Sequence, residues 1–572
     1  VTFPIVTGIT PITAEGTGDV VLDTQAIGDL VQSPLVSGVP VEINYPAGMQ
    51  FTALQGHNTG LYFADEDPDA NSKSMKWSPD SVSGALIFTI NRTVLGWGGT
   101  EIVKKYASPG DAVIGPFSGD WYDAAQLYRR WALTAPWTAK GPIHSRADIP
   151  KWLSDASYWT MGHLDNTEDI NTLIETCAFL GPGIIHAYNY YISPQQDNLL
   201  PEVWPPRIGS EGFKKVVDGF HARGMRIVPY INGFVWDQDT ESYRTQQVAE
   251  KGQIVDSGGG VSTNNVYGGG TQFGQMCPGS KLWQDKLVEV CSHGIARYGL
   301  DGWYFDYFTI HNVNCFNPDH GHPIAGGNYW TQSVRKLYGR IRSELKAINP
   351  DVMMTGEDNA EFVIDLLDTQ FSSGKTGVKA PIYQAVYHDY SLLYGGGYNQ
   401  TGPYVQGRWW LMGGQNGWHN IEGAYAMSER QGSSAEMWRK DGEYYRRLLR
   451  CHRGFGLPYL AYGRMLRMPR ITSDLPIITC PTQGGYPSYT VPAVEGTAWQ
   501  APDKTIGIFF LNYSEEPQEF TWTFNMSEAT GWGAGDRLRL SQWTEEGKLQ
   551  IVAETNGGNL TRSAKMEGRG IM

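Results

Sequence analysis

Two acidic residues stand at the ends of two short apolar segments of this chain. Residues 298–308 read Tyr-Gly-Leu-Asp-Gly-Trp-Tyr-Phe-Asp-Tyr-Phe and deliver a carboxylate at Asp306, and residues 351–357 deliver a second one at Glu357. A helix-like segment, residues 329–348, lies between them. Two parallel strands joined by a helix would present both acids at the same edge of a sheet. Such a pair suits cleavage of a glycosidic bond, in which one acid attacks the anomeric carbon or activates water and the other protonates the leaving oxygen.

In the predicted strand that ends at Asp306, successive side chains point to opposite faces of the sheet. If Asp306 faces the site, Tyr304 shares its face, whereas Trp303 and Phe305 point outward toward covering helices. The alternative is that Asp306 only caps the loop that follows its strand. The role predicted for Glu357 could likewise belong to a nearby acid, Asp358 or Glu361.

The chain is too long for one core, because it has 572 residues. We expect a mixed α/β protein with a (β/α)8 TIM barrel flanked by two β-sandwich domains. The predicted divisions are an N-terminal β-sandwich (residues 1–133), a linker (134–150), the catalytic barrel (151–468) and a C-terminal β-sandwich (469–572). The outer parts show short β-rich runs between Gly, Pro, Asn and Asp clusters, and a helix capped by Asp120 is expected over residues 121–132.

The central part alternates strand and helix patterns, as βα units do. The predicted strands are 157–163, 183–190, 226–232, 302–308, 352–357, 368–371 and 382–389, with an eighth near Trp409 or near residues 459–462. The predicted helices are 168–180, 210–223, 281–297, 329–348 and 434–450. The stretch between Asn232 and Lys281 is rich in glycine, and a loop of that length is expected to be a lid or an irregular excursion.

Several of these segments resemble the α-amylase-type glycosidases. Residues 211–232 are similar to their helix and third strand, Asp301-Gly-Trp-Tyr-Phe-Asp306 to their fourth-strand motif and Thr355-Gly-Glu357 to their fifth-strand motif. Tyr387-His388-Asp389 resembles their His-Asp pair at the seventh strand. The resemblance implies that Asp306 is the nucleophile, that Glu357 is the general acid/base, and that Asp389 and His388 contact the sugar.

The resemblance covers about residues 150–465 and is incomplete. Tyr304 stands where those enzymes carry an arginine, and Gly233 stands where they carry a histidine. A tyrosine can donate a hydrogen bond to the nucleophile but supplies no positive charge. The chain therefore resembles a distant relative of the α-amylase-type enzymes that acts on a different substrate. The expected β-domains before and after the barrel also resemble those of endo-α-N-acetylgalactosaminidases and α-galactosidase-like enzymes.

Other polar and aromatic side chains follow predicted strands, where barrel sites are built. Each could contact the substrate, or could instead bind a loop carbonyl or pack on a helix. These candidates, together with Tyr304, are Trp159, His163, Asp165, Tyr188, Asn189, Tyr190, Asn232, Trp236, Arg408, Trp418 and His419.

Two segments contain residues that could bind metals. Residues 311–322 hold three histidines, Cys315 and Asp319, but their spacing matches no standard zinc pattern, so we expect a loop that shapes the wall of the site. Residues 65–71 alternate oxygen ligands as a calcium loop does, but Lys76 stands at the twelfth position where such a loop carries glutamate. An exposed acidic turn is therefore favoured over calcium, and no cofactor is expected.

The charge balance limits the partners. A net charge of −14 argues against nucleic acid and anionic membranes as partners, and no run approaches the ~20 apolar residues of a membrane span. The six cysteines form no CxxC pair and are expected to be reduced. The compartment stays open between cytoplasm and secretion, as does the oligomeric state. Aromatic content of 12% suits stacking on sugar rings as well as packing in β-domain cores.

The sequence thus predicts a glycoside hydrolase that binds an oligosaccharide or glycoside and retains the anomeric configuration. The preference for an α-linkage follows from the resemblance alone. Two alternatives remain: an inverting or sialidase-like barrel glycosidase, and a non-catalytic carbohydrate-binding protein on a degenerate barrel. A sialidase would require an arginine cluster for the substrate carboxylate, and Arg408 is the nearest candidate.

Overall fold

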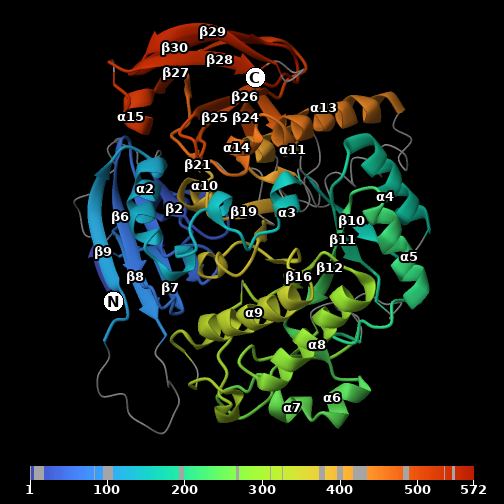
Figure 1. Ribbon diagram of the computed structural model, residues 1–572. Helices are drawn as coiled ribbons and strands as arrows, with labels where there is room; N and C mark the ends of the chain where they lie inside the picture. The colour runs from blue at the N-terminus through green and yellow to red at the C-terminus, as the bar shows by residue number, and fades with distance from the viewer. Residues whose placement is uncertain are drawn as a thin grey trace.

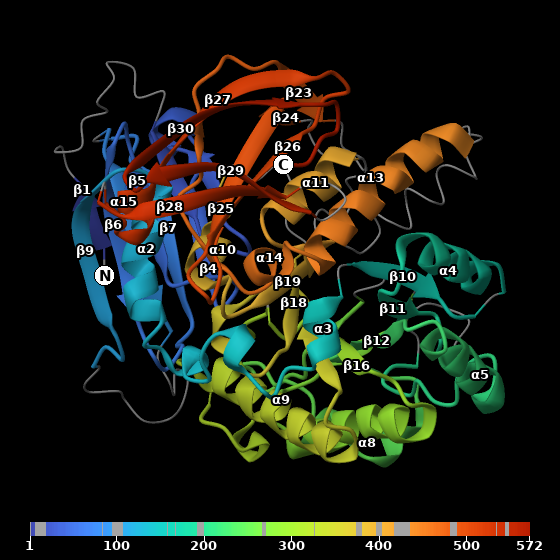
Figure 2. The same ribbon diagram turned by 45° about the horizontal axis from the view of Figure 1, so that its top comes forward.

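The computed structural model describes residues 2–5, 19–82, 84–93, 107–156, 158–165, 167–191, 199–265, 270–309, 311–324, 326–372, 380–395, 403–416, 435–480, 489–533, 535–543 and 548–572. Figure 1 shows three groups of elements: blue N-terminal sheets, a green-to-yellow middle part wrapped by helices, and orange-red C-terminal sheets above them. Figure 2 keeps the same neighbours after rotation. None of the helices within the described ranges combines the length and apolar character that crossing a bilayer requires.

The N-terminal part contains two antiparallel sheets that share a core. One has the order β1-β8-β7-β4 and the other β3-β2-β5-β6-β9. Their strands are β1 (Thr2–Ile5), β2 (Val20–Asp23), β3 (Asp29–Gln32), β4 (Val41–Tyr45), β5 (Phe51–Gln55), β6 (Thr59–Glu66), β7 (Lys73–Pro79), β8 (Leu86–Arg92) and β9 (Asp111–Ser118). Side chains from both sheets, such as Phe63, Trp77 and Phe88, meet in one buried cluster. A short helix α1 (Pro34–Ser37) lies between β3 and β4, and helix α2 (Trp121–Ala132) follows the sheets with the predicted Asp120 capping box.

The middle part is built on parallel strands. The first sheet has the order β10-β11-β12-β16-β17, from β10 (Trp159–His163), β11 (Ile184–Tyr188), β12 (Arg226–Asn232), β16 (Gly302–Asp306) and β17 (Met353–Gly356). The connecting helices are α3 (Lys151–Asp155), α4 (Thr167–Leu180), α5 (Ser210–His221), α8 (Lys281–Tyr298) and α9 (Tyr329–Ile348). These bounds agree closely with the predicted strands and helices up to residue 357.

A second parallel sheet contacts the first near both of its edges. It has the order β18-β19-β20, from β18 (Thr369–Ser372), β19 (Leu392–Gly395) and β20 (Gln415–Asn416). At one edge, the Asp368 N–H donates to the Met354 carbonyl at 2.8 Å. At the other, the Trp159 Nε1–H of β10 donates to the Gln415 side chain at 3.0 Å, and Gln415 Nε2 donates to the Leu153 carbonyl at 2.7 Å.

The last two strands are not where the sequence pattern put them. Residues Ile382–Tyr387 form helix α10 and not a strand, residue 409 lies in helix α11 (Pro403–Leu411), and residue 459 lies in α14 (Leu457–Leu460). All six residues of α10 are buried, so its sequence lacks the polar face that marks a helix, and its aromatic and β-branched residues imitate a strand. Helix α13 (Ala435–Arg453) matches its prediction.

The long connection after β12 is also more ordered than expected. A small antiparallel sheet with the order β13-β15-β14 forms from β13 (Val235–Asp237), β14 (Thr263–Asn264) and β15 (Phe273–Gln275), beside α6 (Glu241–Thr245) and α7 (Val248–Lys251). Short 3-10 turns occur at Pro136–Thr138, Ile143–Ser145, Pro318–His320 and Glu361–Val363. Residues predicted as a linker are partly buried, since Trp137 and Arg146 both have less than a tenth of their surface exposed.

The C-terminal part returns to antiparallel sheets. Their strands are β21 (Arg464–Met465), β22 (Arg470–Ile471), β23 (Ile477–Cys480), β24 (Tyr489–Pro492), β25 (Val494–Gln500), β26 (Ile506–Asn512), β27 (Gln518–Asn525), β28 (Arg537–Trp543), β29 (Leu549–Asn556) and β30 (Asn559–Met566), with helix α15 (Met526–Thr530). Phe510, Phe520 and Trp522 lie at the centre of a core that draws on several of these strands.

Polar contacts join the N-terminal sheets to the middle part. Glu361 is fully buried and accepts hydrogen bonds from the hydroxyls of Tyr128 in α2 and Tyr387 in α10. Arg129 of α2 forms a bidentate ion pair with Asp389, with N–O distances of 2.8 and 2.7 Å. Because buried carboxylates need such donors, these contacts fix how α2 and α10 pack together.

Candidate active site

Asp306 and Glu357 lie side by side at the carboxyl ends of β16 and β17. Phe305 pairs with Gly356 in the parallel ladder, and the Glu357 N–H donates to the Phe305 carbonyl at 3.0 Å. The two carboxyl groups are close enough to share a hydrogen bond. Asp306 exposes 8% of its surface, whereas Glu357 is half-buried. The structure therefore brings together the two acids that the sequence singled out, and Glu361 lies elsewhere, against Tyr128 and Tyr387.

The strands can approach this closely because Gly302 has no side chain. A Cβ at Gly302 would lie 2.4 Å from the Met353 carbonyl oxygen of β17. The residues that follow the two acids, Tyr307 and Asp358, have φ values of 76° and 52° in the left-handed region that favours glycine. Such strain accumulates at functional sites, where the surrounding structure fixes it.

The surroundings favour a proton on Glu357. Burial and then the neighbouring Asp306 charge raise the pKa of Glu357 well above that of an ordinary carboxyl, against a smaller opposing effect of the Tyr307 N–H. That N–H lies 3.3 Å from Glu357 Oε2. Asp306 Oδ2 accepts a hydrogen bond from the Tyr230 hydroxyl at 2.9 Å, which stabilises its ionised form. The pair thus offers one proton donor and one anion.

Aromatic side chains surround the pair. The Tyr230 ring stacks on Tyr188 and Tyr304, with centroid distances of 4.8 and 5.9 Å, and His186 packs on Tyr304 at 4.3 Å. Burial, and then the charges of Glu357 and Asp306, raise the pKa of the Tyr304 hydroxyl. As predicted, its neighbours turn outward: Trp303 binds the Cys291 carbonyl of α8, and Phe305 packs on Tyr338 of α9.

Tyr230 was not among the site residues predicted from the sequence, yet it contacts Asp306. Asn232 Nδ2 donates to the Tyr230 hydroxyl at 3.3 Å, which in turn donates to Asp306. Asn232 is opposite Asp306 in the β12–β16 register, and Tyr230 is two residues earlier on the same face. Period-two alternation from Asn232 would have identified it, as it did for Tyr304.

Most other candidates lie in the core or in ion pairs. Trp159 stacks on Tyr394 at 3.8 Å, Tyr190 packs against Trp204 and Trp303, and Trp236 packs on Trp283. Asp165 forms an ion pair with Arg207 at 2.6 Å. His163 and Tyr188 are paired residues at the ends of β10 and β11, both half-buried, and Asn189 follows with a φ of 50°.

The His388-Asp389 pair does not follow a strand, because α10 replaces the predicted one. Both ring nitrogens of His388 bind backbone carbonyls, Nδ1 that of Gly463 at 2.7 Å and Nε2 that of Gly413 at 3.0 Å. Asp389 binds Arg129 of α2. These contacts connect the pair to α2, β21 and the end of α11, and they correct the strand-based position that the resemblance implied.

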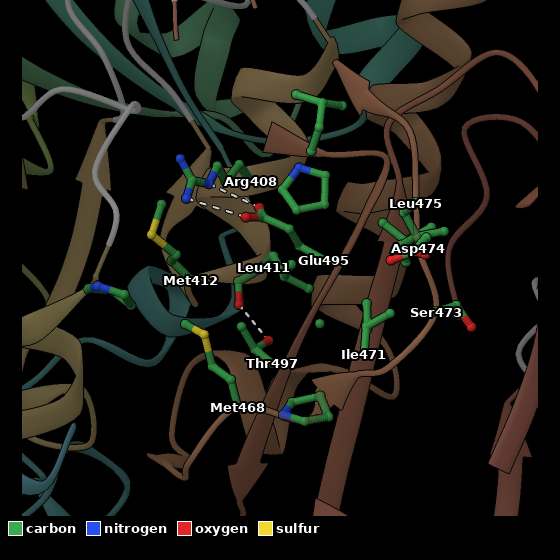
Figure 3. Close-up of a pocket in the computed structure, with 16 residues that line it drawn as sticks. Arg408, Leu411, Met412, Met468, Ile471, Ser473, Asp474, Leu475, Glu495 and Thr497 are labelled. Carbon is green, nitrogen blue, oxygen red and sulfur yellow. Dashed lines mark hydrogen bonds and ion pairs between the residues drawn. The ribbon is translucent and has the colours of Figure 1, made fainter. Parts of the chain in front are cut away.

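Arg408 lies in a different place from the two acids. It forms an ion pair with Glu495 at 3.0 Å on the wall of a cavity of about 390 Å³ between α11 and the C-terminal strands, shown in Figure 3. Met412, Met468 and Ile471 also line the cavity, which contains neither Asp306 nor Glu357. The carboxylate of Glu495 is already paired with Arg408 there, whereas Asp306 and Glu357 lie against each other, so we place the candidate active site at these two acids. Trp418 and His419 lie outside the described residues.

The acidic turn at residues 65–71 is only partly exposed: Pro68 and Asp69 face solvent, whereas Asp65 and Asp67 are buried. Asp65 binds Lys73 at 2.9 Å and Arg92, and Asp67 binds Lys73 at 3.1 Å. Asp67 also accepts the Asn71 N–H at 2.8 Å. These cations make it possible to bury the carboxylates.

Known proteins resemble this chain in sequence and in fold. A Bacteroides thetaiotaomicron protein named "Putative glycoside hydrolase" is 29% identical over 364 residues, covering 62% of this chain and 52% of that protein. A Monosiga brevicollis protein named "Putative glycoside hydrolase 22789" is 26% identical over 496 residues, covering 75% of this chain and 40% of that protein. The chain spans about half or less of the length of these curated relatives.

Solved structures share the fold at low identity. The ligand-free α-N-acetylgalactosaminidase NagBb from Bifidobacterium bifidum has a TM-score of 0.59 at 14% identity, covering 88% of this chain and 83% of that one. A GH36 α-galactosidase, AgaA from Geobacillus stearothermophilus, has a TM-score of 0.51 at 11% identity, covering 99% and 76%. A family model described as a domain of unknown function, DUF6259, matches residues 106–399, which include both acids. Because that match spans just over half of the 572 residues, the chain belongs to the DUF6259 family.

Proposed function

We propose that this protein is a glycoside hydrolase in which Asp306 is the nucleophile and Glu357 is the general acid/base. The observation that carries the proposal is the hydrogen-bonded pair of carboxyl groups at the ends of β16 and β17. The names of the two sequence relatives support the same activity, as does the shared fold with two glycosidases. We further propose that the two parallel sheets close into a (β/α)8 barrel, with a β-sandwich domain on either side.

The proposed reaction has two displacements. Asp306 attacks the anomeric carbon while the glycosidic C–O bond breaks, and Glu357 gives its proton to the departing oxygen. Glu357, now a carboxylate, then takes a proton from water, whose oxygen attacks the anomeric carbon and breaks the ester to Asp306. Each step inverts the anomeric centre, so the product retains the configuration of the substrate. The raised pKa of Glu357 keeps its proton available near neutral pH.

The short separation of the acids favours retention over inversion. An inverting enzyme needs room for a water, with carboxyls ~6.5–9.5 Å apart, whereas a retaining enzyme needs ~5–5.5 Å. A pair of carboxyl groups that share a hydrogen bond lies nearer to the retaining separation than to the inverting one.

The remaining alternatives find less support. A sialidase needs arginine near the reacting groups, but Arg408 is paired with Glu495 in another cavity. A non-catalytic sugar-binding protein does not need two adjacent carboxyl groups, because each makes ionisation of the other unfavourable when both are buried. We therefore keep the hydrolase as the proposed function.

The proposed substrate is an α-linked glycoside. The names of the structural neighbours, an α-N-acetylgalactosaminidase and an α-galactosidase, make galactose-configured sugars the first to test. The half-buried Tyr188, which stacks on Tyr230, would supply an apolar face for the sugar ring.

A panel of α- and β-aryl glycosides, followed by NMR of the first-formed anomer, tests substrate class and stereochemistry together. Azide rescue then separates the two acids, because a small anion can replace a missing group. The Glu357→Ala enzyme should form an α-glycosyl azide from an activated α-glycoside, since azide replaces the water of the second step. The Asp306→Ala enzyme should form the β-azide, since azide then attacks in place of Asp306. Turnover by Asp306→Ala at the wild-type rate without azide would rule out the proposed nucleophile.

A further inference from the structure

Four side chains that are scattered in the sequence converge on one point behind the loop that follows β16. They are Cys277, Cys315, His320 and His322, and one ligand atom from each lies within 4.8 Å of the ligand atoms of the others. Cys277 precedes α8, whereas the other three lie between β16 and α9. Only the second group forms a cluster in the sequence, because Cys277 is far from it along the chain.

The spacing of the four atoms suits a tetrahedral metal ion. Cys277 Sγ lies 3.1 Å from His322 Nε2, and Cys315 Sγ lies 3.5 Å from His320 Nδ1. Zinc binds Cys at ~2.3 Å and His at ~2.0–2.1 Å, so tetrahedral geometry sets sulfur and nitrogen ligands ~3.5 Å apart. Ordinary packing would not bring two thiols and two imidazoles so close together, because burying polar atoms is unfavourable without strong hydrogen bonds or a bound ion.

Neighbouring groups orient these ligands as outer contacts do in metal sites. His322 Nδ1 lies 2.8 Å from the Pro323 carbonyl, so Nδ1 carries the hydrogen and Nε2 turns its lone pair toward Cys277. Backbone N–H groups of Gly279 and Ser280 donate to the Cys277 sulfur. Glycine is required at 279, because a Cβ there would lie 2.4 Å from the His322 ring.

Burial indicates that the site is closed. Cys277, Cys315 and His320 are buried, and His322 is half-buried against Tyr329 of α9, with ring centroids 4.5 Å apart. Four protein ligands fill the coordination of zinc and leave no position for water or substrate, which is typical of structural sites.

The geometry points to a structural Cys2His2 zinc site, formed by Cys277, Cys315, His320 and His322, that ties the loop after β16 to the starts of α8 and α9. Hard cations such as calcium and magnesium prefer oxygen ligands and are disfavoured by two thiolates. The four ligands include neither Asp306 nor Glu357, so this assignment can be tested independently of the proposed hydrolase activity.

Metal analysis of the purified full chain tests the site. Protein expressed with zinc and passed through gel filtration should hold about one zinc per chain. Cys277→Ser and Cys315→Ser should lose most of it. Cys177→Ser, on α4, and His293→Gln, on the exposed side of α8, should keep it as matched controls. Zinc that persists in both ligand variants would overturn the assignment, as would wild-type protein without zinc.

X-ray absorption of the wild-type protein keeps the test decisive if a ligand variant fails to fold. The expected spectrum has two sulfur neighbours at ~2.3 Å and two nitrogen neighbours at ~2.0–2.1 Å. A shell of nitrogen and oxygen alone would contradict the site. A Cys277–Cys315 disulfide, detected as a pair of cysteines that resists alkylation before reduction, would contradict it equally.

Discussion

Asp306 and Glu357 are chemically similar groups that share a small buried volume, yet their surroundings assign them different charges. Two adjacent anions would repel each other, so a proton stays on one of them. Tyr230 donates to Asp306, whereas Glu357 receives only a long contact from the Tyr307 N–H. The side chain with the better donor keeps the negative charge, and the other keeps the proton.

The Tyr230 hydroxyl is therefore expected to matter for catalysis. Hydrogen bonds to charged groups contribute ~1.5–3 kcal/mol, so Tyr230→Phe should lower kcat about 10- to 100-fold with little change in KM. Steady-state kinetics on the substrate found in the glycoside panel measures this.

Tyr298→Phe provides a matched control. Its hydroxyl bonds Ser210 at 3.0 Å, between α8 and α5, so kcat should stay at the wild-type value. If Tyr230→Phe also turns over at the wild-type rate, the hydroxyl does not stabilise the nucleophile.

Strand ends and alternation were enough to find the acids, but not all of their neighbours. Asp306, Glu357 and Tyr304 follow from a period of two on strands with clear ends. Trp159, Tyr190 and Trp236 also stand at strand positions, but large aromatic side chains pack equally well in a core, and the sequence does not separate these uses. The bond from Arg129 to Asp389 spans 260 positions of the chain, so no local pattern could indicate it.

The strands and helices were predictable where the sequence has either a two-sided pattern or a short buried run with clear ends. Strand β12 and helix α9 match their predicted bounds, since α9 has a strongly two-sided pattern and β12 is a continuous buried run bounded by turn residues. Helix α10 is buried on every side, so nothing in its composition distinguishes it from a strand. Strand β20 was missed for a different reason: with two residues it is too short to show any periodicity.

The close pairing of β16 with β17 makes Gly302 a sensitive position. In Gly302→Ala the new methyl group meets the Met353 carbonyl at 2.4 Å, so the strands must separate. Overpacking of this kind costs ~1–3 kcal/mol, and the separation should lower activity as well as Tm. Thermal unfolding and kinetics of the variant measure both effects.

The corresponding change in a helix should act in the opposite direction. Gly339 lies within α9, and a Cβ there meets only the Leu366 side chain at 3.9 Å. Gly339→Ala should therefore stabilise the protein by ~0.5–1 kcal/mol. A Gly302→Ala protein as stable and active as wild type would show that β16 and β17 do not need this contact.

Across the whole molecule, the buried Glu361 links stability to pH. Burial raises the pKa of Glu361 from 4.5 to about 7, although the Tyr387 and Tyr128 hydroxyls oppose the shift. Between pH 4.5 and 7, the folded protein holds a proton that the unfolded chain has released. The contribution of Glu361 to stability is thus full below pH 4.5 and is lost as the pH rises through 7.

Glu361→Gln should remove this dependence. The free energy of unfolding of the wild type should fall relative to that of the variant, by on the order of 3 kcal/mol between pH 4 and pH 8. Urea unfolding at several pH values measures the difference. Glu211→Gln, on the exposed side of α5, serves as the control and should follow the wild type. Parallel curves for wild type and Glu361→Gln would contradict a titrating carboxyl at this interface.

Gln415 lies beyond the segment that matches the family, but its side chain contacts residues inside that segment. The family match stops at residue 399, yet the Gln415 side chain binds Trp159 and the Leu153 and Ala156 carbonyls. A fragment limited to residues 106–399 would lack Gln415 and leave these groups at the start of the middle part without their partner. The unit that must fold together is therefore larger than the segment by which the family is recognised.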